Sequence, residues 1–119
     1  MGTGRGLTLH RRCTYSVRVP PTVDQLAAFL LRLRRAVHEG RVEIRAYALD
    51  GLRDLEWSAG DLRLQLLDLT VDDFHRTEDS TAPRGGLIWV FTPELWGEGH
   101  LWIRLVEGAG IVVISFHNG

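Results

Sequence analysis

The sequence contains no lysine and only one cysteine, Cys13, among its 119 residues. A lone cysteine cannot form an internal disulfide, which excludes the disulfide-stapled class of small secreted domains. No apolar run approaches the roughly 18–20 residues that a membrane-spanning helix needs. The first residues, Met-Gly-Thr-Gly-Arg-Gly, lack the apolar stretch of a secretory signal. We therefore expect a cytoplasmic protein that has no membrane partner.

The net charge is only −1, but it is unevenly distributed. Residues 1–45 contain nine arginines and three acids, whereas residues 46–119 contain five arginines and twelve acids. A nearly neutral chain is not suited to strong nonspecific binding of nucleic acid, so DNA is not an expected partner. The basic N-terminal third either contacts phosphate or an acidic partner, or forms a solvated helix face.

The composition, 45% hydrophobic and 24% charged, is typical of a folded soluble domain. The length suits one core. Residues 1–13 are rich in glycine and arginine without a period and are expected to form a flexible leader. The single domain then spans residues 14–119. Within it, residues 14–19 alternate and can form a short extra strand before two prolines end it.

Three capping boxes mark helix starts in the next part of the chain. The first, Thr22 to Gln25, predicts a helix over residues 23–39 with Gly40 as its C-cap. The second begins at Ser58 and the third, for a single turn, at Thr70. Residues 41–49 are ambiguous, because they alternate like a strand but can also begin a helix that reaches Leu55.

From residue 74 onward the sequence predicts an antiparallel meander, with strands at 74–79, 87–92, 100–106 and 111–117 separated by glycine and proline. Helices followed by strands indicate an α+β fold. We expect two or three N-terminal helices packed on one face of an antiparallel sheet of about four strands.

The last two predicted strands form a hairpin around residues 107–110. If Val106 pairs with Ile111, then Arg104 faces Val113, Trp102 faces Ser115 and His100 faces His117. One face of the hairpin is then wholly apolar: Leu101, Ile103, Leu105, Val112, Ile114 and Phe116. The other face gathers the two histidines with an arginine, a tryptophan and a serine, and this is the expected functional face.

These residue types suit metal-free RNA cleavage, which needs a base, an acid and cations near the phosphate. His100 and His117 are the expected proton-transfer pair, since histidine exchanges protons near neutral pH. Arg104 can hold phosphate through two hydrogen bonds, and Trp102 can stack on an unpaired base. Glu78, on the same strand face as Arg76, is a second base candidate.

Simpler interpretations exist for each of these residues. The histidines can be solvated strand ends, Arg76 and Glu78 an exposed ion pair, and the whole face a protein-binding surface with tryptophan and arginine anchors. His10, His38 and His75 lack metal-ligand spacing, so no metal or cofactor is expected. An enzyme acting on another small substrate is the least favoured hypothesis, because no nucleotide-binding loop or nucleophile elbow is present.

Six segments together resemble the MqsR family of toxin ribonucleases, which has a RelE/YoeB-like fold. They are Gly40–Val42, Ala48–Leu49, Asp68–Arg76, Ile88–Trp89, Gly99–Arg104 and Ile111–His117. The resemblance implies that the family's catalytic lysine corresponds to Arg76 and the tyrosine before it to His75. It also implies that a tyrosine corresponds to Trp102, a glutamine to Val90 and a terminal lysine to His117. Ser115 is an expected substrate contact on the same face.

The resemblance implies a toxin-like endoribonuclease of a type II toxin–antitoxin system. Its expected substrate is mRNA, cleaved without a metal by attack of the 2′-hydroxyl, and its expected partner is a cognate antitoxin. The substituted positions leave a second hypothesis open. In that case the chain is a catalytically reduced member of the fold that binds a protein or RNA partner through the same face.

Overall fold

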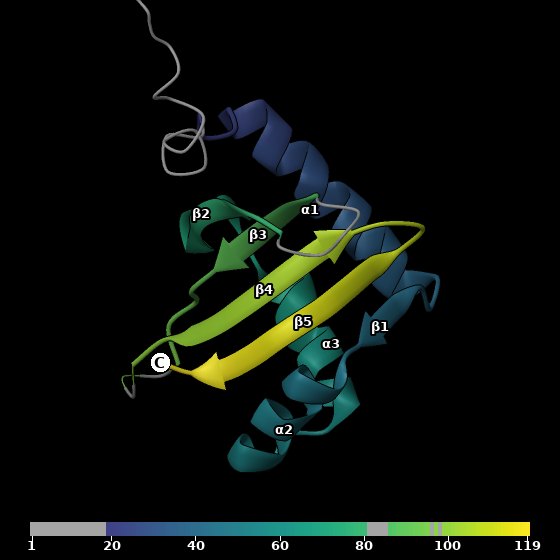
Figure 1. The fold of residues 1–119 in the computed structure, drawn as a ribbon, viewed down its shortest axis with the longest axis vertical. Helices are drawn as coiled ribbons and strands as arrows, with labels where there is room; N and C mark the ends of the chain where they lie inside the picture. The colour runs from purple at the N-terminus through teal and green to yellow at the C-terminus, as the bar shows by residue number, and fades with distance from the viewer. Residues whose placement is uncertain (1–18, 81–85, 96, 98) are drawn as a thin grey trace, which may run out of the picture.

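The computed structural model describes residues 19–80, 86–95, 97 and 99–119. In this part of the chain three α-helices, one 3₁₀ turn and five strands follow one another (Figure 1). The elements are α1 (Val23–His38), β1 (Val42–Ile44), α2 (Ala46–Leu55), α3 (Ala59–Asp68), the turn Val71–Asp73, β2 (Phe74–Asp79), β3 (Leu87–Phe91), β4 (Leu101–Glu107) and β5 (Ile111–Asn118). The predicted leader and extra strand lie outside the described residues, except for Val19. None of the described helices combines the length and apolarity needed to cross a membrane.

The three predicted helix starts are confirmed. Thr22 and Ser58 each accept a hydrogen bond from the backbone N–H three residues later, and each box is closed by the returning side chain. The box at Thr70 starts the single 3₁₀ turn. After α1, Gly40 has a positive φ of 72°, a conformation that glycine adopts without steric cost. The ambiguous segment contains both expected elements, the strand β1 and then helix α2.

The sheet has five strands in the order β1-β5-β4-β3-β2. The predicted meander of four antiparallel strands is confirmed for β2 to β5. The expectation of a wholly antiparallel sheet was wrong, because β1 adds to β5 in parallel. The chain leaves β1 through helices before it returns, and a parallel pair needs such a crossover connection.

The core lies between the sheet and the helices, which are behind the sheet in Figure 1. Phe29 of α1 stacks on Trp89 with ring centroids 4.2 Å apart, and Phe91 lies 6.0 Å away. Trp89 is thus part of the core, and Trp57 packs against Phe116 at 5.5 Å. These contacts show which face of β3 and β5 is turned toward the helices.

Helix α2 covers the part of β5 that the short strand β1 does not reach. β1 pairs with residues 111–113 only. Further along β5, the backbone at Phe116 lies against Gly51 of α2, where an added Cβ would be 1.5 Å from the carbonyl oxygen of Phe116. A glycine is required at this position because any side chain would clash with backbone.

The hairpin register differs from the prediction. Glu107, not Val106, pairs with Ile111, and the pairing then shifts between Arg104 and Leu105. Leu105 pairs with Val113 and Arg104 with Ser115, so Ile114 is an extra residue, a β-bulge. Val113 and Ile111 therefore face the core, whereas Val112 and Ile114, predicted as core, are only partly buried. After the bulge, Phe116 is buried and His117 is partly exposed, as predicted.

Candidate functional site

The side of the sheet turned away from the helices carries the predicted site, and we call it the outer face. One row of paired residues crosses four strands on this face: Arg76, Val90, Arg104 and Ser115. Trp102 and His117 form the next pair along β4 and β5. Because paired residues share a face, six of the eight predicted site residues fall within this region: Arg76, Glu78, Trp102, Arg104, Ser115 and His117.

A second β-bulge brings His75 to the same region. Phe74 pairs with Phe91 and Arg76 with Val90, so His75 is the extra residue on β2. Simple alternation would place His75 and Arg76 on opposite faces of the strand. The His75 ring instead lies against Trp102, with centroids 5.0 Å apart and the rings nearly perpendicular. The bulge therefore turns two successive side chains toward the outer face.

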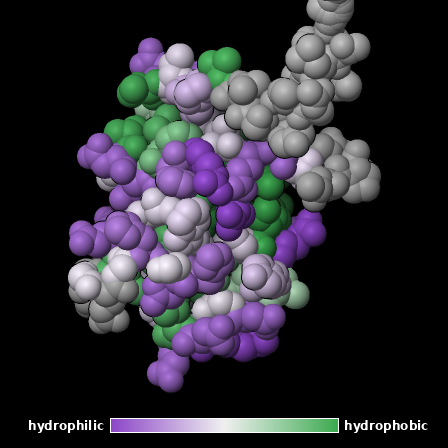
Figure 2. Space-filling model, turned by 60° about the vertical axis from the view of Figure 1, so that its left-hand side comes forward, coloured by the Kyte–Doolittle hydropathy of each residue, from purple (hydrophilic) through white to green (hydrophobic). Residues whose placement is uncertain are grey.

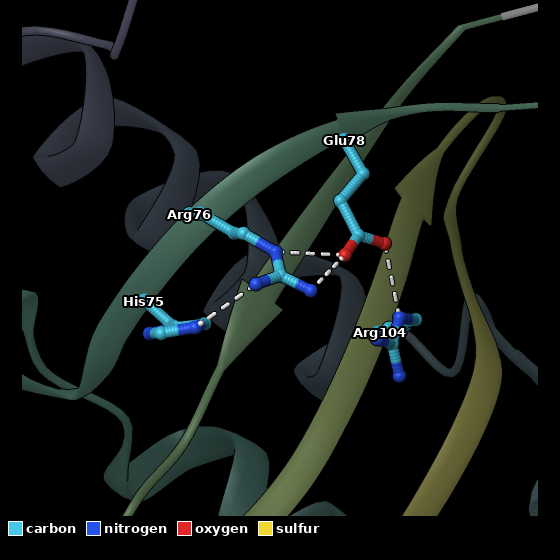
Figure 3. Close-up of polar contacts among 4 residues, drawn as sticks. All are labelled: His75, Arg76, Glu78 and Arg104. Carbon is cyan, nitrogen blue, oxygen red and sulfur yellow. Dashed lines mark hydrogen bonds and ion pairs between the residues drawn. The ribbon is translucent and has the colours of Figure 1, made fainter. Parts of the chain in front are cut away.

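Glu78 connects two arginines from different strands (Figure 3). Its Oε2 accepts a hydrogen bond from Arg76 Nε at 2.8 Å and lies 2.6 Å from Arg76 Nη2. Its Oε1 accepts from Arg104 Nε at 3.0 Å. Sequence reasoning paired Glu78 with Arg76 but missed Arg104, which lies on β4 and reaches Glu78 across β3.

The residue beneath this charged cluster is Val90 of β3. It pairs with Arg76 on one side and with Arg104 on the other, and it is completely buried. A short side chain here leaves space for the charged side chains of β2 and β4 to meet above it. Val90 replaces the glutamine that the resemblance implies, and in this chain it supports the cluster instead of contributing a polar group.

Trp102 is surrounded by the charged groups of the cluster. The guanidinium carbons of Arg76 and Arg104 lie 5.8 Å and 5.7 Å from the centroid of its ring, within the range of cation–π attraction. A Cβ added to Gly119 would lie 1.9 Å from the indole, so the backbone of that residue also contacts the ring. Trp102 thus holds the two arginines and His75 around one aromatic centre.

The environment of Glu78 favours its ionised form. The hydrogen bond from Arg104 contributes most to lowering the pKa of Glu78, partial burial opposes it, and Arg76 adds to the lowering. A carboxylate with a lowered pKa is a weak base. The predicted role of Glu78 as a second base therefore has no support from its surroundings, which suit a group that fixes the two arginines.

His75 makes one polar contact, with Arg76. The Nη1 atom of Arg76 lies 3.3 Å from Nε2 of the imidazole. Arginine can only donate, so Nε2 is the acceptor in the tautomer that carries its proton on Nδ1. The contact places a histidine, a candidate proton-transfer group, beside a cation.

His100 does not occupy its predicted position opposite His117. The register shift gives that position to Trp102. His100 lies at the exposed start of β4, where it forms an isolated bridge with Glu94 and its carbonyl accepts from the N–H of Gly119. The expected His100–His117 pair was therefore wrong, because the turn register differs by one residue from the assumed one and the bulge at Ile114 shifts the pairing by one more. The histidines adjacent to Trp102 are His75 and His117.

Ser115 has a buried hydroxyl. Its side chain is 6% exposed, and its Oγ has no hydrogen-bond partner among the described residues. In the same part of the chain, no group of three or more histidine, cysteine, aspartate or glutamate side chains is placed to hold a metal ion.

A hollow of about 420 Å³ lies between α1 and the end of the sheet. It is lined by residues such as Gln25, Thr77 and Trp89 and by none of the charged cluster. Figure 2 shows a side of the molecule on which hydrophilic side chains surround separate apolar patches.

No protein-family model matches this chain, and no curated protein matches its sequence. The resemblance to the toxin ribonucleases therefore stays a prediction.

Proposed function

We propose that this protein is an endoribonuclease that cleaves RNA on the outer face of its sheet by attack of the 2′-hydroxyl. The observation that carries the proposal is the gathering of two arginines and two histidines around Trp102. These side chains come from β2, β4 and β5, and two β-bulges contribute to the arrangement. Bulges frequently lie next to active sites because they redirect a side chain.

The residues divide into cations and proton-transfer groups. Arg76 and Arg104 would bind the scissile phosphate and stabilise the negative charge that develops on it. His75 would take the proton from the 2′-hydroxyl on Nε2 once Arg76 has turned from this nitrogen to the phosphate. The attacking oxygen forms a bond to phosphorus, and His117 would donate a proton to the leaving 5′-oxygen. The products are a 2′,3′-cyclic phosphate and a free 5′-hydroxyl.

The toxin–antitoxin setting rests on the resemblance alone. It implies growth arrest when the protein is expressed without its antitoxin. A second function, partner binding without cleavage, is favoured by the neutralisation of part of the arginine charge by Glu78 and by the enrichment of tryptophan and arginine at protein interfaces.

Purified protein and a mixed-sequence RNA distinguish these functions. We expect His117→Ala or His75→Ala to slow cleavage by about 100-fold or more, the range for loss of a general acid or base. His38→Ala is the matched control, because His38 is an exposed histidine at the end of α1. Sequencing of the cleavage ends reports the products. RNA binding without cleavage favours the second function, and unchanged cleavage in both histidine variants contradicts the assigned site.

A further inference from the structure

Glu78 occupies the position between two guanidinium groups that a phosphate would take. One carboxylate oxygen binds Arg76 and the other binds Arg104. Carboxylate and phosphate are alternative partners for the same planar donors of arginine. The structure therefore shows the arginines with an internal anion in place.

The cluster still has unused binding capacity. Glu78 balances one of the two arginine charges, and an anion that takes its place between the guanidinium groups meets both. Among the described residues, Arg104 donates a hydrogen bond to Glu78 through Nε, and its Nη1 and Nη2 atoms make no hydrogen bond. The side chains of Arg104 and Glu78 are 24% and 26% exposed, so a ligand can reach them.

We propose that Glu78 makes this arginine pair selective for a doubly charged phosphate over the singly charged phosphodiester of an intact strand. Replacing Glu78 by a diester exchanges one negative charge for another and leaves the charge of the site unchanged. A terminal phosphate carries about −1.5 to −2 at neutral pH and neutralises both arginines. The inference rests on the proposed function in that it takes the ligand to be an RNA end.

The same selectivity would serve cleavage. The phosphorane formed by attack of the 2′-oxygen carries one more negative charge than the diester from which it forms. A site that accepts the dianion better than the monoanion binds the transition state better than the substrate, which is the condition for catalysis. A terminal phosphate is then a stable ligand of matching charge.

Binding of short oligodeoxynucleotides tests the proposal, because they lack the 2′-hydroxyl and cannot be cleaved by this route. Oligomers that end in a 3′-phosphate, a 5′-phosphate or hydroxyls only are compared by fluorescence anisotropy with the full chain. We expect the phosphate-ended oligomers to bind about tenfold more tightly to the wild type at neutral pH. The preference should fall as the pH decreases through about 6, where the terminal phosphate becomes a monoanion.

Glu78→Gln should remove most of this preference by tightening the binding of the hydroxyl-ended oligomer. Glu107→Gln is the matched control. It also removes a carboxylate that is paired with an arginine, but this arginine is Arg32 on the helix side of the sheet. The preference for phosphate-ended oligomers should therefore be retained. The pH dependence of the wild type tests the same point without any substitution.

Three results would overturn the inference: equal binding of all oligomers by the wild type, weaker binding of all oligomers by Glu78→Gln, or competition by inorganic phosphate as strong as that of the phosphate-ended oligomer. The last result assigns the site to free phosphate. Selective binding by a protein that cleaves no RNA supports the inference and contradicts the proposed ribonuclease function. Cleavage of RNA without selective binding supports the ribonuclease function and contradicts the inference.

Discussion

The two faces of the sheet differ in almost every respect, although the same strands build both. On the helix side, aromatic rings stack on one another, and every second side chain along most of β4 is buried in the core. On the outer face, a charged cluster covers Val90. Phe116 and His117 are neighbours in sequence but belong to the core and the outer face respectively. We therefore expect stability and the proposed binding to depend on separate sets of residues.

The ion pairs of the two faces show the same contrast. Arg32 and Glu107, on the helix side, form a balanced pair with two hydrogen bonds of 2.6 Å and 3.0 Å. Glu78, on the outer face, is shared by two arginines. A balanced exposed pair connects two elements and contributes little else. An unbalanced cluster keeps charge available for a ligand.

The largest expected effect tests the separation of the faces directly. Phe116→Ala removes a fully buried ring and should lower the free energy of unfolding by about 3–5 kcal/mol. His117→Ala, one residue further, should change it by less than about 0.5 kcal/mol, the usual effect of a surface substitution. Urea denaturation measures both values. Similar losses in the two variants would show that the outer face also supports the fold.

A smaller effect of opposite sign is expected at Ser115, the outer-face residue with an unbonded buried hydroxyl. Ser115→Ala should raise the free energy of unfolding by about 1 kcal/mol, because a buried group without a hydrogen bond is costly. Ser58→Ala is the matched serine control and should lower it by about 1 kcal/mol, since Ser58 caps α3. Thermal melting compares the two. A loss at Ser115 would mean that its hydroxyl is bonded in solution.

The smallest expected effect is on the free energy of unfolding in acid. The pKa of Glu78 is lowered in the folded protein by Arg104 and then Arg76, so ionised Glu78 stabilises the fold. This contribution is present above the ordinary glutamate pKa of about 4.5 and is lost as the pH falls through the lowered value. The stability difference between wild type and Glu78→Gln should therefore shrink in acid, by about 1 kcal/mol or less. Chemical denaturation at several pH values measures it, and a difference that grows in acid would contradict the assignment.

Local signals in the sequence were sufficient for α1, α3 and the antiparallel strands. The capping boxes at Thr22 and Ser58 are complete within four residues, so the signal and the structure it specifies lie together. The antiparallel strands were visible from their alternation and from the breakers between them. Residues 41–49 left strand and helix as alternatives, because α2 lacks a side-chain cap. The parallel pairing of β1 was not predicted, since three residues hold too little pattern and the partner strand lies some 70 positions later in the chain.

The shared face of the candidate residues was predictable, but the contacts among them were not. Alternation placed Trp102 and Arg104 on one face of β4, where they lie. The His100–His117 pair failed because nothing in the sequence marks the turn register or the bulge at Ile114, and each displaces the pairing by one residue. The bulge at His75 and the contact from Glu78 to Arg104 depend on packing between strands that are distant in sequence. Such contacts are decided by the tertiary structure.

The bulge at Ile114 also determines where this strand can change its length. The residues on either side, Val113 and Ser115, pair with consecutive residues of β4, Leu105 and Arg104. The regular pairing of β5 with β4 therefore needs one residue fewer than β5 contains. Loss of a residue beyond the bulge would turn the later side chains to the opposite face. A one-residue deletion at Ile114 is compatible with Phe116 in the core and His117 on the outer face.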